Sequence, residues 1–324
     1  MKDAIDEAQK LLLENKDKWV PRYKGYAEEI NKKKTNIKYL RQTFREWEPL
    51  SFYISTTNIK KTKKSLFLDV RYKGQSVATL KATQNSITLS TKSNKDVKNN
   101  TNLRDFNCSI RLNDDKWLDD KAAEFRKYFS KNPPRLRVKD NKGNEEHNVE
   151  SLLLTEFSKK IGKNKQILGI QPIKIGEIRF AMPTPISASD HKKTLTYPKK
   201  GGGIDIFART GKGSSTFLTV IEVKDQNKNT EPPTDALKQA IQYAVFIREL
   251  LRSECGQDWY NIFGFSGNVP NKLKIRVACA MPDDILEKSF AGNIYSIGND
   301  ELECHYIYFK YDGKQVSNFQ TSLI

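Results

Sequence analysis

Histidine and cysteine are scarce in this chain, and neither residue type is arranged for metal binding or for covalent catalysis. The 324 residues include three histidines and four cysteines, namely His147, His191, His305, Cys108, Cys255, Cys279 and Cys304. The cysteines stand too far apart for a zinc site or a disulfide framework, and the histidines share no metal-ligand spacing. No histidine can be placed beside a serine or cysteine nucleophile, so the sequence disfavours covalent catalysis. We interpret His191 as a solvated loop residue rather than a general base.

Long apolar runs are also absent. No segment approaches the roughly 20 apolar residues that cross a bilayer as a helix, and the segment from Met1 to Glu7 lacks the apolar stretch of a secretion signal. Hydrophobic residues make up 37% of the chain and charged residues 29%. The sequence therefore predicts a polar, cytoplasmic protein without a membrane partner, and its length favours two domains.

Negative charge is in short supply relative to positive charge. The chain has 56 lysines and arginines against 39 aspartates and glutamates, which gives a formal net charge of +17. An excess of this size favours a polyanionic partner, because a protein that neutralises phosphates releases their counterions. The composition points to nucleic acid, although a solubilising surface rich in lysine would give the same balance.

The first predicted domain covers residues 1–145. Helical spacing of apolar residues predicts helices within residues 1–47, joined by a basic connector over residues 31–38. Short strands separated by polar turns are expected over residues 51–112. These patterns predict a basic N-terminal α+β domain that binds DNA. The stretch over residues 132–146, with its prolines and glycine, is the predicted hinge, although it also fits a hairpin within one domain.

The second predicted domain covers residues 146–324 and mixes helices with strands. An amphipathic helix is expected from Val149, and a long helix from Thr234. A hairpin lies between these two helices, and strands over residues 274–280 and 305–309 follow the second. This order predicts an α/β fold in which helices flank a mixed sheet.

The predicted hairpin carries the residues that indicate chemistry. Gly201-Gly-Gly-Ile-Asp205 leads into it, and Thr219-Val-Ile-Glu222-Val-Lys224 forms its second strand. Because strand side chains alternate, Glu222 and Lys224 share a face, and burying them is costly unless they meet a metal or one another. Carboxylate oxygens suit Mg²⁺, so we assign Asp205 and Glu222 as metal ligands, with the Val223 carbonyl as a further one. Paired carboxylates with a lysine suit metal-assisted hydrolysis of a phosphodiester. In that reaction Lys224 would contact the attacking water or the scissile phosphate.

These residues resemble the core of the PD-(D/E)xK nuclease superfamily, which includes restriction endonucleases and RecB-like nucleases. The resemblance covers about residues 147–311 and departs from the pattern at Ile204, where the family name has proline. It implies a restriction-endonuclease-like core and a helix before the hairpin that carries a further acidic residue. Glu156 is our candidate for that residue, ahead of Glu150 and Glu177.

The resemblance also implies a helix after the Glu-x-Lys strand. Gln239-Ala-Ile-Gln-Tyr243 matches the Gln-x-x-x-Tyr pattern of RecB-like members, and residues four apart share a helix face. We therefore expect Gln239 and Tyr243 to reach DNA phosphate or Lys224. Relatives with an iron–sulfur cluster have grouped cysteines, which this chain lacks, so no cluster is expected. Gly211-Lys-Gly-Ser-Ser lacks the first glycine of a phosphate loop, so we interpret it as a turn and expect no nucleotide cofactor.

A basic segment in the first predicted domain is the candidate DNA contact. It is made of Lys60, Lys61, Lys63, Lys64 and Arg71. We expect these side chains to contact the nucleic-acid backbone without reading bases. The neighbouring aromatic residues Tyr53, Phe67 and Tyr72 fit base stacking, but we favour them as core residues.

Together these patterns predict a Mg²⁺-dependent DNA endonuclease of restriction or defence type, in which Mn²⁺ also serves. Double-stranded DNA is the favoured substrate, and the sequence is compatible with a homodimer. Three alternatives stay open: an inactive nucleic-acid-binding or assembly subunit that keeps the fold, a nuclease that acts on RNA, and a surface hairpin whose Glu–Lys pair stabilises by only about 0–1 kcal/mol.

Overall fold

The computed structural model describes most of the chain. It leaves out residues 44–47, 55–64, 84–85, 93–105, 107, 134–144, 162–164, 177, 189–194, 198–200, 229–230 and 324, and it describes only the backbone of residues 34–43, 160–161 and 165–166. In the part that it describes, no helix combines the length and the apolar composition needed to span a membrane.

The chain divides into two units, each with its own sheet. The first unit comprises residues 1–27, 149–173 and 181–324, and the second comprises residues 28–148 and 174–180. Apart from a shift of the boundary by three residues, to Asn148, this division differs in two places from the predicted division into residues 1–145 and 146–324. The first 27 residues belong with the C-terminal part of the chain, and a short later segment completes the sheet of the second unit. Both differences arise from packing between segments far apart in sequence, which local patterns do not encode.

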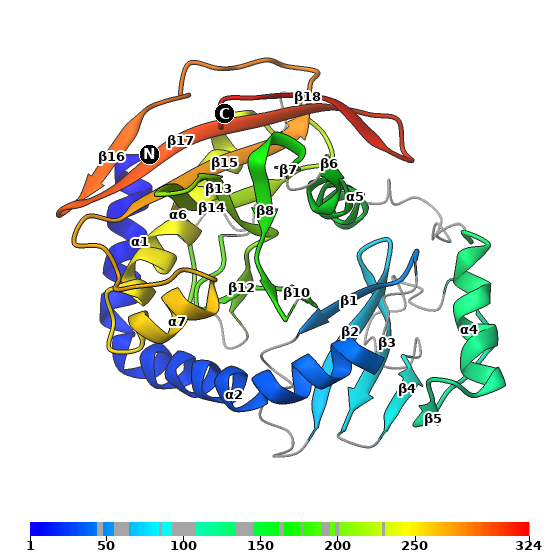
Figure 1. The fold of residues 1–324 in the computed structure, drawn as a ribbon. Coiled ribbons are helices and arrows are strands. Elements are labelled where there is room, and N and C mark those ends of the chain that lie inside the picture. Colours follow the sequence, from blue (N-terminus) through cyan, green and yellow to red (C-terminus); the bar gives the residue numbers. More distant parts are fainter. Residues whose placement is uncertain are drawn as a thin grey trace. The chain divides into compact units, whose positions relative to one another are not determined.

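The first unit is built on a mixed sheet. Its strands lie in the order β16 (Ile294–Ile297), β17 (Asp300–Tyr311), β15 (Lys274–Pro282), β14 (Ser215–Val223), β13 (Ile206–Lys212) and β8 (Ile170–Pro172), with β18 (Val316–Thr321) paired to β17. Strands β14, β15 and β17 run parallel to one another, and the remaining pairs are antiparallel. Figure 1 shows this sheet with helices beside it, so the predicted mixed sheet flanked by helices is confirmed at this level.

Helix α6 (Pro233–Leu251) forms the centre of the helical layer in the first unit. Pro233 at its start and Asp235 in its first turn favour helix initiation. The helix contacts β14 and β15 and also helix α1 (Lys2–Glu14), so it is apolar on most sides rather than along a single stripe. The apolar positions of α1, among them Ala8 and Leu12, are fully buried. This packing explains why the first residues of the chain belong to this unit.

The beginning of helix α2 (Lys16–Thr43) also packs in the first unit. The Trp19 and Tyr23 rings lie 5.7 and 5.0 Å from the ring of Phe246 on α6. The Tyr23 hydroxyl donates a hydrogen bond to the Pro183 carbonyl at 2.7 Å. Helix α2 continues without a break through residues 31–38, so the predicted basic connector there is wrong. Lysine is a good helix former, and its charge alone does not end a helix.

Shorter elements complete the first unit. The helical ones are α5 (Glu146–Ser158), α7 (Gly256–Ile262) and the 3₁₀ turn η2 (Ile167–Gly169). The strand pairs are β6 (Lys160–Ile161) with β7 (Lys165–Gln166), and β11 (Pro183–Thr184) with β12 (Gly202–Gly203). Helix α5 begins three residues before the unit boundary. Helix α5 packs towards strand β18, with the Phe157 ring 5.9 Å from the Phe319 ring. The amphipathic helix expected from Val149 is thus present and starts three residues earlier.

In the residues that the structure describes, the second unit contains another sheet and a helix. The strand order is β5 (Asp115–Lys116), β4 (Ile87–Thr91), β3 (Gln75–Ala82), β2 (Leu66–Tyr72), β1 (Ser51–Ile54), β10 (Ile178–Phe180) and β9 (Lys174–Ile175), with helix α4 (Asp120–Ser130) following β5. Strand β10 joins by parallel pairing with β1. Tyr53 and Tyr72 are buried, and the Tyr72 ring lies 4.9 Å from Phe129 of α4. The interpretation of these two tyrosines as core residues is confirmed, whereas Phe67, predicted with them, is only half-buried on β2.

A buried ionic network ties helix α6 to the sheet of the first unit. The Asp300 carboxylate is 2% exposed and accepts hydrogen bonds from Arg248 at 2.8 Å, from Arg252 at 3.0 Å and from the Leu273 N–H at 2.9 Å. Burial alone would raise the pKa of Asp300, but the bonds from Arg252, Leu273 and Arg248 outweigh it and hold the pKa below its ordinary value. The stabilisation is therefore present above the ordinary aspartate pKa and is lost as the pH falls through the lowered pKa.

We expect Asp300→Asn to lower the free energy of unfolding by about 1.5–3 kcal/mol, because it removes the anion that two partly exposed arginines share, while Arg248 keeps its pair with Glu249. Urea unfolding at neutral pH measures this loss. Asp283→Asn is the matched control, since Asp283 pairs at 3.0 Å with Lys310, whose side chain is 63% exposed, and such pairs contribute about 0–1 kcal/mol. Equal losses in the two variants would contradict the role given to Asp300.

Candidate metal and catalytic site

The hairpin β13–β14 positions the acidic residues predicted from sequence. Ile206 pairs with Ile221 in the antiparallel register, so Asp205 and Glu222 stand at the same end of the two strands. Val220, Ile221 and Val223 are fully buried, as expected for a β-branched strand covered on both faces. The Lys224 N–H donates to the Ala280 carbonyl at 3.0 Å, which fixes the end of β14 against β15.

The Asp205 carboxylate is attached directly to the neighbouring strand. Its Oδ2 accepts a hydrogen bond from the Val223 N–H at 2.9 Å. The N–H and the C=O of a strand residue point to the same side, so the Val223 carbonyl is directed to the side on which Asp205 lies. The structure thus brings together the carboxylates of Asp205 and Glu222, two of the groups that we predicted as metal ligands.

The glycine run before Asp205 has a steric reason. Gly201 has φ +70°, and a Cβ there would lie 2.0 Å from the Thr184 carbonyl oxygen. A Cβ on Gly202 would lie 2.7 Å from the Ile186 oxygen and 3.1 Å from the Tyr243 hydroxyl. Only glycine lets this backbone pair with β11 and approach α6 so closely.

Lys224 lies between an acid and an amide. Its Nζ is 3.3 Å from Glu222 Oε1 and donates to Gln239 Oε1 at 3.4 Å. Glu222 and Lys224 are each 5% exposed and Gln239 is 6% exposed. The strand alternation predicted that Glu222 and Lys224 share a face, and Gln239 reaches Lys224 from helix α6. Gln239 therefore restricts where the ammonium group can point.

Tyr243 is one turn further along helix α6 and has a different neighbour. Its hydroxyl accepts a hydrogen bond from the Ala188 N–H at 3.2 Å. Burial, and then the nearby Glu222 carboxylate, raise the pKa of Tyr243 above its ordinary value, so the phenol stays neutral at physiological pH. The position of Tyr243 beside the glycine run suits holding the segment before Asp205.

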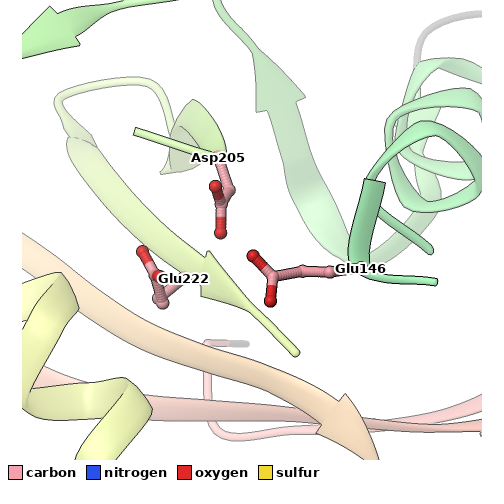
Figure 2. A group of neighbouring side chains, drawn as sticks. All are labelled: Glu146, Asp205 and Glu222. Carbon is pink, nitrogen blue, oxygen red and sulfur yellow. The ribbon is translucent and has the colours of Figure 1, made fainter. Parts of the chain in front are cut away.

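A third carboxylate, which the sequence analysis missed, comes from the start of helix α5. Oxygen atoms of Glu146, Asp205 and Glu222 all lie within 4.8 Å of one another. Figure 2 shows the three side chains directed towards a common space, each from a different element. The predicted helix began at Val149 and so excluded Glu146, although an acidic pair at a helix start is a recognisable helix signal.

The three acids that we considered for this role lie elsewhere or outside the described residues. Glu156 is ten residues after Glu146 in α5, about 15 Å along the helix axis, and it pairs with Lys159. Glu150 is buried one turn after Glu146 but is not part of the carboxylate group. Glu177 falls outside the described residues. The group that forms therefore contains Glu146 in the place that we had given to Glu156.

The donor set of this group fits a hard divalent cation. Two ionised carboxylates at this separation repel by roughly 3–4 kcal/mol at an effective dielectric constant of about 20. Among the four groups, three carboxylates face the single ammonium of Lys224, which leaves an excess of two negative charges. Oxygen ligands with this excess suit Mg²⁺ or Mn²⁺.

The predicted DNA-contacting residues are placed only in part. Lys60, Lys61, Lys63 and Lys64 fall outside the described residues. Arg71 is half-buried in strand β2, where its Nε donates to Asp69 at 2.8 Å and its guanidinium lies 4.3 Å from the Tyr53 ring centre. Its charge is thus engaged within the sheet of the second unit.

The chain was compared with protein-family models, with curated proteins and with solved structures. No protein-family model, no curated protein and no solved structure matches the chain.

Proposed function

We propose that this protein is a metal-dependent nuclease that hydrolyses phosphodiester bonds in DNA, with Mg²⁺ as its cofactor and Mn²⁺ as a substitute. The observation that carries the proposal is the convergence of Asp205, Glu222 and Glu146 beside Lys224. Carboxylates with a neighbouring lysine supply what phosphodiester hydrolysis needs, which is a place for a divalent cation and a fixed positive charge near the reacting phosphate.

Each side chain has a distinct task in this mechanism. Bound Mg²⁺ would neutralise charge on the scissile phosphate and help to activate the attacking water. Asp205 and Glu222 hold the cation, together with Glu146 and the Val223 carbonyl. Lys224 contacts the attacking water or a phosphate oxygen and stabilises the charge that develops there. Gln239 orients Lys224 through the contact described above.

The substrate assignment rests on charge and on the resemblance of the hairpin to PD-(D/E)xK nucleases. A formal charge of +17 favours a polyanion. Within the first unit, a hairpin that carries the acids, followed by a helix that reaches the lysine, supports a restriction-endonuclease-like core. Double-stranded DNA stays the favoured substrate, and a homodimer and a role in restriction or defence remain part of the proposal.

A parallel digest tests this function. Plasmid DNA, single-stranded DNA and RNA are incubated with the protein in Mg²⁺, in Mn²⁺ and in a chelator. We expect cleavage of DNA in either metal and none in the chelator. Cleavage of RNA alone would redirect the proposal to a ribonuclease. Binding of DNA without cleavage of any substrate would support a non-catalytic subunit instead.

Two glutamates on helix α5 provide a direct test of the third ligand. We expect Glu146→Gln to lower the rate of DNA cleavage in limiting Mg²⁺ by about 100-fold, because it removes one anionic donor from the cation. Glu156→Gln on the same helix is the matched control and should leave the rate within about twofold, since it removes only a surface pair. A larger loss of cleavage rate in Glu156→Gln than in Glu146→Gln would instead indicate Glu156 as the third metal ligand.

A further inference from the structure

A pocket in the first unit lies at the opposite end of strand β14 from the carboxylates. Its volume is about 550 Å³, and it is formed by the β13–β14 turn, the start of β15, helix α7 and the loop after that helix. Thr216 lines it and stands six residues before Glu222 on β14, which is about 20 Å along the strand. The pocket is therefore separate from the proposed catalytic site.

The described lining of this pocket is cationic. Arg209, Lys272 and Lys274 contribute to it, and no acidic residue does. The two lysines pair with acids outside the lining, Lys272 with Glu301 at 2.6 Å and Lys274 with Glu303 at 3.5 Å. Their charge is thus partly balanced, whereas Arg209 has no ion pair among the described residues and contacts a backbone carbonyl.

Arg209 is the group best placed to receive an anion. Its Nη1 donates to the Gly264 carbonyl at 2.9 Å, which anchors the guanidinium to the wall. Its Nε is enclosed and has no hydrogen-bond partner among the described residues. Burial lowers the pKa of Arg209, which reflects lost hydration of its charge. A phosphate group beside the guanidinium would supply the negative charge that this cation lacks.

Aromatic rings form the other part of the lining. Tyr260 and Phe265 stack with ring centres 4.7 Å apart and planes inclined by 14°, and Phe217 also lines the pocket. Phe265 is only partly buried, so its ring offers area to a ligand, whereas the Phe217 ring already packs against the Arg276 guanidinium at 4.8 Å. A flat aromatic group packs well against such rings.

We propose that this pocket binds a free mononucleotide, with its phosphate at Arg209 and its base against the Tyr260–Phe265 stack. A cavity of this volume is in the range of small-molecule sites, and phosphate plus a planar base matches the combination of cations and rings. The turn at residues 211–215 forms only part of the rim and does not act as a phosphate loop. The proposal does not depend on nuclease activity.

Isothermal titration calorimetry with adenosine 5′-monophosphate tests the site on the full chain. We expect saturable binding, with adenosine alone and inorganic phosphate alone each binding more weakly. Arg209→Gln should weaken binding of the nucleotide about tenfold or more, because it removes a charged hydrogen-bond donor. Phe265→Leu should weaken it by loss of stacking. Lys212→Gln, at an exposed position of the same hairpin that does not line the pocket, should bind as the wild type does.

Three results would overturn the assignment. The first is the absence of saturable heat with the wild-type protein. The second is an affinity for the nucleotide that is the same in Arg209→Gln and in Phe265→Leu as in the wild type. The third is displacement of the nucleotide by a 5′-phosphorylated oligonucleotide, which would make the pocket a site for a strand end rather than for a free nucleotide.

Discussion

Glu222→Gln is expected to reduce DNA cleavage by about a thousandfold or more while the protein stays folded and still binds DNA. The variant keeps the size of the side chain and removes the negative charge that holds the cation. Cation stabilisation of the transition state contributes several kcal/mol, and each 1.36 kcal/mol corresponds to a factor of ten in rate. Initial rates of plasmid nicking in Mg²⁺ measure the loss.

The control for this variant separates chemistry from general charge. Glu254→Gln also removes one negative charge from the first unit, but Glu254 lies on the surface, where its side chain is 58% exposed. It should cleave at the wild-type rate. A gel-shift assay in Ca²⁺ should show that both variants bind DNA as tightly as the wild type, because neither removes a positive charge. Wild-type cleavage by Glu222→Gln would exclude the assigned site.

Lys224→Met should produce the second large effect, a fall in cleavage rate of about 100- to 1,000-fold. That is the range found when one group that stabilises developing charge is removed. Methionine keeps the length and the apolar stem of lysine and lacks the ammonium. The loss should appear in the catalytic rate at saturating DNA rather than in DNA affinity. Lys238→Met, at an exposed position on helix α6, is the matched control and should retain activity.

The effect of Mg²⁺ on the unfolding temperature is a second measurement on the Lys224→Met variant. Removing the ammonium leaves the Glu222 carboxylate, which is 5% exposed, without the partner that lies 3.3 Å away, and broken buried pairs cost about 3–5 kcal/mol. A cation bound by Glu222 would offset part of that loss. We therefore expect Mg²⁺ to raise the unfolding temperature more in Lys224→Met than in the wild type. A fall in cleavage without this larger Mg²⁺ response would contradict a cation at Glu222.

The sequence predicted the elements of the fold better than their assembly. Helix α6 and strands β14, β15 and β17 carry strong local signals, since their apolar and β-branched positions follow helix or strand spacing. The packing of α1 on α6 depends on two apolar faces far apart in sequence. The pairing of β10 with β1 is likewise a long-range contact that no local pattern specifies.

The candidate site was predictable where its geometry is local. Glu222 and Lys224 share a strand face by alternation, and the hairpin register brings Asp205 alongside. Glu146 was missed because its position depends on where helix α5 begins and on how that helix meets the hairpin. Helix order favoured Glu156, but order along the chain does not say which turn of a helix approaches a strand.

Calorimetric titration of the protein with Mn²⁺, without DNA, is the most direct test of the central claim that these carboxylates form one cation site. We predict saturable binding in the wild type and its loss in Asp205→Asn, Glu222→Gln and the double variant, with Glu156→Gln unchanged. Wild-type Mn²⁺ binding in the double variant, or no binding in the wild type, would contradict the account.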